Sequence, residues 1–199
     1  MQRITPHLWF DKEAKEAAGF YASLFPNSKI THVTTLHNTP SGDCDVVSFE
    51  LAGQPFMAIS AGPLFKPNPS VSFQVKCKAK DEVDAVWEKL SRGGNVRMPL
   101  GNYPFSERYG WVEDRYGVSW QLIYAGDIEI KQRITPVLMF VGKVCGKTQE
   151  AADFCTSVFK GSPDGARAAG AHDGGSPCAL RRGRGTGQRR YGKIRVLRG

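Results

Sequence analysis

An internal repeat constrains the fold of this chain more than any other feature of its sequence. The run Arg3-Ile4-Thr5-Pro6 recurs as Arg133-Ile134-Thr135-Pro136, and Glu16-Ala17-Ala18-Gly19-Phe20 recurs as Glu150-Ala151-Ala152-Asp153-Phe154. The likeness ends at Phe159, where the first copy continues into alternating strands. Repeats of this kind mark duplicated structural units. A second domain therefore starts at residue 133 and stops, incomplete, at residue 160.

The sequence after the second copy has a different composition from the rest of the chain. Residues 160–199 hold ten basic and two acidic side chains, whereas residues 1–159 hold 17 of each. Few large apolar side chains occur in this Gly/Arg-rich tail, so burial cannot offset the entropy of ordering, and we expect residues 161–199 to be disordered. A shifted reading frame and a natural linker tail both explain such a segment. An Arg/Gly tail can bind RNA. The folded part has equal numbers of basic and acidic side chains, so no nucleic-acid partner is predicted for it.

Hydrophobic periodicity divides residues 1–126 into two similar units. In the first, a strand at 4–10 precedes a helix at 14–25 and strands near 30–36, 45–51 and 55–60. In the second, a strand at 71–77 precedes a helix near 81–92 and strands near 96–100, 109–113 and 118–124. The pattern predicts an α+β domain of paired β-α-β-β-β modules, followed by a linker at 127–132.

Targeting and metal signals are weak in this sequence. The start has neither the basic patch nor the apolar stretch of a secretory signal, and no run approaches the roughly 18 residues of a membrane helix, so we expect a cytoplasmic protein. The five cysteines never form a C-x-x-C pair, which gives no indication of a structural zinc site.

The paired modules and four sequence runs resemble one known family. The runs at 4–10, 20–25, 53–58 and 109–121 are similar to the PhnB-like branch of the vicinal oxygen chelate superfamily, within a resemblance that spans residues 3–124. That branch is also named the 3-demethylubiquinone-9 3-methyltransferase family, and the superfamily includes glyoxalase, bleomycin-resistance protein and extradiol dioxygenases. The resemblance implies a cup formed by two modules, with a small molecule or a divalent metal inside it.

Strand alternation, combined with this resemblance, selects the residues expected to line the cup. On each strand the apolar set packs on the helix, and the polar set points to the opposite face. A small neutral or aromatic ligand is expected, because aromatic walls with a few polar groups are typical of small-molecule sites. The expected ligand-binding residues are His7, Trp9, Ser72, Gln74, Phe105, Trp111 and Gln121. No catalytic residue is predicted, and the adjacent Glu113 and Asp114 are expected to be structural.

The family's metal positions are only partly filled here. The resemblance places them on Pro6 or His7, near residues 58–60, on Ser72 and on Gln121. A catalytic metal site generally needs three protein ligands. With His7 and Gln121 as weak candidates and Glu50 as a weaker third, a divalent metal is an open alternative, and no cofactor is firmly predicted.

Several functions and one partner follow as expectations. The first expected function is small-molecule binding. The alternatives are a metal-dependent lyase, isomerase or dioxygenase, and the methyltransferase of the family name. That name lacks a mechanism in these residues, because the first strand enters Asp11-Lys12-Glu13-Ala14 without the Gly-rich turn of a doubly wound methyltransferase. A homodimer is expected, since Phe140, Phe154 and Phe159 have no sheet of their own.

Overall fold

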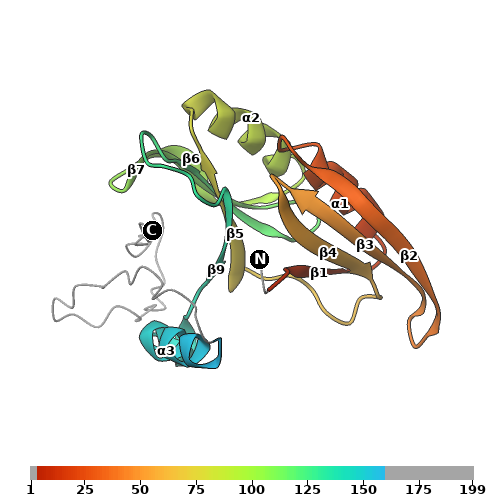
Figure 1. Ribbon diagram of the computed structural model, residues 1–199. Helices are drawn as coiled ribbons and strands as arrows, with labels where there is room; N and C mark the ends of the chain where they lie inside the picture. Colours follow the sequence, from red (N-terminus) through yellow and green to blue (C-terminus); the bar gives the residue numbers. More distant parts are fainter. Residues whose placement is uncertain (1–3, 160–199) are drawn as a thin grey trace, which may run out of the picture. The chain divides into compact units, whose positions relative to one another are not determined.

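The computed structural model describes residues 4–159 and has the α+β architecture that the sequence predicts (Figure 1). Its elements in chain order are β1 (His7–Phe10), α1 (Ala14–Ala22), β2 (Lys29–Thr39), β3 (Gly42–Leu51), β4 (Gln54–Ser60), β5 (Val71–Cys77), α2 (Lys80–Ser91), β6 (Asn95–Tyr103), β7 (Ser106–Glu113), β8 (Ser119–Tyr124), β9 (Ile134–Leu138), the short 3-10 helix η1 (Gly142–Val144) and α3 (Thr148–Val158). None of the described helices is long and apolar enough to cross a membrane.

The strands of residues 4–159 form two sheets, one for each predicted module. The first sheet has the order β1-β4-β3-β2, and the second has the order β6-β7-β8-β5-β9. In each module the first strand runs parallel to the last one, β1 beside β4 and β5 beside β8, while the other neighbours are antiparallel. This arrangement confirms the predicted pair of β-α-β-β-β modules.

The first module packs α1 on one face of its sheet. Small residues at helical spacing allow close contact, and Ala14, Ala17, Ala18 and Tyr21 are all fully buried. One expected boundary of this module is wrong: Ile4 lies outside the strand, because pairing with β4 begins at His7. At the start of α1 the first helical N–H, that of Ala14, donates to Ser60 Oγ at 3.1 Å.

The second module packs α2 on its own sheet in the same way. Val83, Val86 and Leu90 are the buried residues of α2. The helix is followed by Gly93 at φ +71°, as expected of a glycine that ends a helix. At Gly110 on β7 a Cβ atom would lie 2.5 Å from the Trp87 ring, so only glycine lets this helix approach the sheet so closely.

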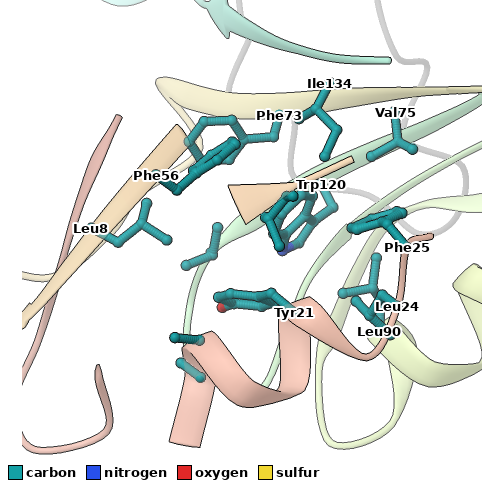
Figure 2. Packing of buried hydrophobic residues seen from close by; sticks show 14 of the residues in the cluster. Leu8, Tyr21, Leu24, Phe25, Phe56, Phe73, Val75, Leu90, Trp120 and Ile134 are labelled. Carbon is teal, nitrogen blue, oxygen red and sulfur yellow. The ribbon is translucent and has the colours of Figure 1, made fainter. Parts of the chain in front are cut away.

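One hydrophobic core joins the two modules (Figure 2). The Tyr21 ring from α1 lies 5.2 Å from that of Trp120 on β8, and the Phe56 and Phe73 rings lie 5.4 Å apart across the modules. Asp114, in the turn after β7, strengthens this junction.

The Asp114 carboxylate is buried and has four hydrogen-bond donors. It accepts bonds from the Tyr21 hydroxyl at 2.7 Å and from Trp120 Nε1 at 2.8 Å, and also from the backbone N–H groups of Tyr116 and Val118. Burial raises the pKa of this carboxyl, although the hydrogen bonds from Tyr21 and Trp120 act in the opposite direction. These contacts agree with the structural role expected for Asp114.

The second copy of the repeat supplies β9 and α3. β9 does not begin a sheet of its own but pairs antiparallel with β5, at the edge of the second sheet. The described residues from 139 to 159 belong to a separate unit, in which α3 buries none of its residues and Phe154 is 68% exposed. The tail predicted at 161–199 lies outside the described residues.

Candidate functional site

The face of the second sheet that points away from α2 carries a chain of buried polar side chains. The Tyr109 hydroxyl donates to Gln121 Oε1 at 2.8 Å, and Gln121 Nε2 donates to Ser72 Oγ at 2.8 Å. Tyr109, Gln121 and Ser72 are only 0%, 4% and 1% exposed. They come from β7, β8 and β5, which are neighbours in the sheet. The pairing of these three strands therefore brings the three side chains together, and we refer to Tyr109, Gln121 and Ser72 as the polar chain.

Strand alternation explains why these polar residues share one face. Phe73, Val75, Trp120 and Leu122 point into the core, so Ser72, Gln74 and Gln121 point the other way. The register places Gln74 directly opposite Gln121. These polar side chains therefore adjoin one another on the face away from α2.

Aromatic side chains adjoin the polar chain. Trp111, opposite Gln121 in the register, donates through Nε1 to Ser119 Oγ at 2.7 Å. The Phe105 ring meets the Tyr109 ring edge-on at 4.9 Å and stacks on Tyr103 at 5.6 Å. We refer to Tyr103, Phe105, Tyr109 and Trp111 as the aromatic wall.

The chemistry of the polar chain is that of neutral hydrogen bonding. Burial raises the pKa of the Tyr109 hydroxyl well above its usual value, so Tyr109 stays protonated and donates. The Gln121 amide is thereby oriented with its NH₂ group toward Ser72. A serine hydroxyl that accepts a bond keeps its own hydrogen and a second lone pair for another partner. Ser72 thus ends the chain with a group that can both donate and accept.

His7 and Trp9 lie on the other sheet. Trp9 is half-buried, donates from Nε1 to the Gly62 carbonyl at 2.8 Å and meets the Phe65 ring edge-on at 5.0 Å. His7 is exposed on β1, opposite Met57. The structure therefore joins Ser72 and Gln121 directly and places Gln74 and Trp111 on the same sheet. Phe105 lies in the turn between β6 and β7, and His7 and Trp9 lie on the first sheet.

Sequence reasoning did not include Tyr109 and Ser119 in the site. Both positions could have been found, because Tyr109 alternates with Trp111 and Ser119 with Gln121 along strands that were predicted. Only the register showed that Tyr109 lies diagonally across from Gln121, within hydrogen-bonding reach.

The described residues do not fit a metal centre. Within 4–159 no group of three or more His, Cys, Asp or Glu side chains is placed to hold an ion. Both ends of the Gln121 amide are engaged by protein groups. The third candidate, Glu50, lies opposite Lys29 and pairs with its ammonium group at 3.7 Å.

Two paired β-α-β-β-β modules, each with its first strand parallel to its last, define a protein of the vicinal oxygen chelate superfamily. Comparison with family profiles is more specific. The chain belongs to the family described as 3-demethylubiquinone-9 3-methyltransferase, whose profile matches residues 2–123.

The chain is also similar to several solved structures. A Bacillus cereus protein described as a putative 3-demethylubiquinone-9 3-methyltransferase, PhnB protein, is 42% identical with a TM-score of 0.59, over 62% of this chain and 100% of its own. Protein PA1353 from Pseudomonas aeruginosa is 23% identical with a TM-score of 0.56, over 64% of this chain and 100% of its own. The fosfomycin resistance protein FosX from Listeria monocytogenes is 17% identical with a TM-score of 0.48, over 66% of this chain and 98% of its own. No curated protein matches the chain significantly.

Proposed function

We propose that this protein binds a small uncharged molecule, with an aromatic or other flat apolar part, on the polar face of the second sheet. The observation that carries the proposal is the buried chain from Tyr109 through Gln121 to Ser72. Buried polar groups are costly unless they are bonded, so these bonds fix the directions of the three groups, and Ser72 keeps a hydroxyl hydrogen that the bond from Gln121 does not use.

The aromatic wall supports the flat part of the ligand. Offset or edge-to-face contacts with aromatic rings favour planar groups, and they complement a small number of directional hydrogen bonds. Gln74 lies opposite Gln121 and adds a second amide to the same surface. A ligand with one ring and one or two hydroxyl, carbonyl or amide groups fits this combination.

The polar chain favours a neutral ligand over an anion, and the cation nearest to it on β5 is Lys76, two residues from Gln74 on the same face. Glu113, the acidic residue of β7 nearest Trp111 in sequence, is held by Arg97 at 2.6 Å. The polar chain itself contains a phenol, an amide and a hydroxyl, which carry no net charge. A phosphate would find no matched cation among these three side chains.

The family name provides a second candidate. The 42% identical relative from Bacillus cereus is described as a putative methyltransferase acting on 3-demethylubiquinone. In this chain β1 leads to α1 without a glycine turn for a nucleotide-like cofactor, so the residues support binding of a ring compound more than methyl transfer.

Thermal-shift screening of the full chain tests the proposal. Neutral phenols, quinones and aromatic amides form the main panel, while inorganic phosphate, polyphosphate and S-adenosylmethionine serve as comparison compounds. We expect stabilisation by members of the neutral panel, with the shift lost in Gln121→Leu and kept in Gln149→Leu, a change on the surface of α3. Stabilisation by polyanions alone contradicts the proposal, and a shift with S-adenosylmethionine favours the methyltransferase.

A further inference from the structure

A row of four residues crosses the second sheet on the face that points away from α2. Trp111 on β7 lies opposite Gln121 on β8. Gln121 lies opposite Gln74 on β5, and Gln74 lies opposite Thr135 on β9. Residues that are opposite one another in neighbouring strands project to the same face of a sheet. The row therefore runs from an indole at one end to a hydroxyl at the other, with two amides between them.

Gln74 is the member of this row whose polar group is left without a partner. It is only 5% exposed, and within the part of the chain that the structure describes its amide forms no hydrogen bond. Burial of an amide without a partner is costly, and most buried polar side chains in proteins are bonded. The row thus contains one buried amide that the fold itself does not use.

The Gln74 amide is still within reach of solvent. The fully enclosed side-chain atoms that lack a partner in residues 4–159 are Arg97 Nε and Arg133 Nε. The oxygen and nitrogen of the Gln74 amide are not among them, so each keeps some exposed surface. A small molecule on this face of the sheet can therefore contact both atoms.

The two glutamines of the row differ in what they offer a ligand. Gln121 accepts from Tyr109 through Oε1 and donates to Ser72 through Nε2, so both of its ends are engaged. Gln74 keeps a free oxygen and a free NH₂ group, which a carboxamide holds side by side in one plane. This pair is complementary to a group that has an N–H donor and a carbonyl acceptor on one edge, such as a lactam or an imide.

We infer that Gln74 recognises a cyclic amide: the ligand is a flat ring compound whose lactam or imide edge forms two hydrogen bonds with the Gln74 amide. The inference rests on the proposed function, because it uses the same face of the second sheet. Neighbouring strands lie about 4.8 Å apart, so Trp111 and Gln74, which are two strands apart, are separated by roughly 10 Å. A bicyclic lactam can contact the Trp111 ring and the Gln74 amide at the same time.

β9 adds a hydroxyl beside the free amide. It lies next to β5 at the edge of the sheet (Figure 1). Its half-buried Thr135 is the residue opposite Gln74. A carbonyl oxygen has two lone pairs, so a ligand carbonyl can accept one bond from Gln74 and another from this hydroxyl. The second copy of the repeat thereby contributes a polar group to the amide end of the row.

A carboxylate is the competing ligand chemistry on this face. Lys76 lies two residues from Gln74 on β5, so its ammonium group can attract an anion there. A carboxylate, however, has acceptors only, and it would leave Gln74 Oε1 without a donor. The neutral amide edge satisfies both atoms of Gln74, which is why it is favoured.

Three matched bicyclic compounds test the inference on the full chain. Dihydrocarbostyril is a benzo-fused lactam, its N-methyl derivative lacks the donor, and dihydrocoumarin has an ester oxygen in place of the N–H. Isothermal titration calorimetry should show the lactam bound about tenfold or more tightly than either comparison compound, because each of these leaves a buried polar atom unpaired. Gln74→Met, which keeps the length of the side chain, should reduce this preference to about twofold or less. Gln149→Leu on α3 is the matched control and should keep it.

A measurement without ligand covers the case in which Gln74→Met disturbs the fold. An apolar side chain in place of an unpartnered buried amide removes a desolvation cost, so the thermal midpoint should be kept or raised. Gln121→Leu takes a partner from Tyr109 and from Ser72 and should lower the midpoint. A loss in Gln74→Met as large as that in Gln121→Leu would show that the protein itself uses the Gln74 amide, and would overturn the inference.

The binding results separate this inference from the proposed function. Equal affinity for the three compounds overturns the amide assignment, as does a lactam preference that survives in Gln74→Met. Tighter binding of hydrocinnamate, an aromatic carboxylate of similar size, assigns the contact to Lys76 and also overturns it. In each of these cases binding of neutral ring compounds still supports the proposed function. Absence of binding by every neutral aromatic compound overturns the proposed function, and this inference with it.

Discussion

The two sheets have the same topology, but the faces that point away from their helices differ. In the first sheet this face carries an exposed His7 and half-buried Trp9, Met57 and Ser48. In the second sheet the corresponding face buries Tyr109, Gln121 and Ser72 and bonds them to one another.

Burial explains this difference. An exposed polar side chain is satisfied by water, whereas a buried one must find a protein partner. The same alternating pattern therefore gives an ordinary surface in the first module and an ordered polar site in the second. The variants below test whether the second module and its junction have the tighter packing that this account requires.

The largest effect is expected at the junction between the modules. Asp114→Ala removes the acceptor of the Tyr21 hydroxyl and the Trp120 indole, and should lower the free energy of unfolding by about 3 kcal/mol, as is typical when buried donors lose their partner. Asp84→Ala, which breaks a partly exposed pair with Arg108, should cost at most about 1 kcal/mol. Urea denaturation measures both, and equal losses would show that the junction is not held by Asp114.

A second comparison uses one glycine from each module. Gly110→Ala forces a methyl group against the Trp87 ring and should destabilise the protein by about 2 kcal/mol, as overpacking of a core does. Gly19→Ala on α1 meets no atom within 4 Å and should stabilise it by about 0.5–1 kcal/mol, because alanine favours helix. Opposite signs in thermal or urea unfolding are expected, and a harmless Gly110→Ala would contradict the close packing of α2 on β7.

The polar chain can be compared with an exposed bond on the first sheet. Tyr109→Phe leaves Gln121 Oε1 buried without its donor and should cost about 1–2 kcal/mol of unfolding free energy. Thr34→Val removes an exposed bond to His32 and should change it by less than about 0.5 kcal/mol. If the two variants lose the same amount, burial is not what distinguishes the two faces.

The smallest effect concerns acid stability, where two aspartates act in opposite directions. Hydrogen bonds from Thr35 and Lys15 lower the pKa of Asp45 below 3.8, so its contribution to stability is lost as the pH falls through the folded-state value. Burial raises the pKa of Asp114, so its contribution is present at low pH and is lost as the pH rises above the unfolded value.

Asp45→Asn should therefore flatten the acid-induced loss of stability slightly, and Asp114→Asn should steepen it. The free energy of unfolding measured by urea between pH 3 and pH 6 separates the two slopes. Slopes that change in the same direction for both variants would contradict the assignment of opposite pKa shifts.

Much of the fold could be predicted from residue patterns. The helix face of α1, the core set of β8 and the succession of helix and strands along each module follow from periodicity and from the repeated modules. The position of β9 could not be predicted, because periodicity identifies a strand without naming its partner. Ile134 reads equally well as the start of a new sheet or as an added edge on an existing one.

Only part of the candidate site could be predicted, because periodicity gives the face of a strand but not its neighbour. Alternation placed Ser72, Gln74 and Gln121 on the face away from the core, where the structure has them, since that follows from a period of two residues along each strand. His7 was placed beside them because the resemblance implies a cup that brings strands of both modules together, whereas in this structure the outer neighbour of β5 is β9. Choice of neighbour is a tertiary property, and local sequence does not encode it when two segments are nearly identical.

Ligand affinity on the two sheets is the most direct test of the proposed function. Isothermal titration calorimetry of the full chain would use the neutral aromatic compound that gives the largest thermal shift. Gln121→Leu should weaken its binding about tenfold or more, equivalent to roughly 1.4 kcal/mol for a lost buried hydrogen bond. Trp9→Leu, on the first sheet, should bind as tightly as the parent. Loss of binding in Trp9→Leu with full affinity in Gln121→Leu would place the site on the first sheet and contradict the account.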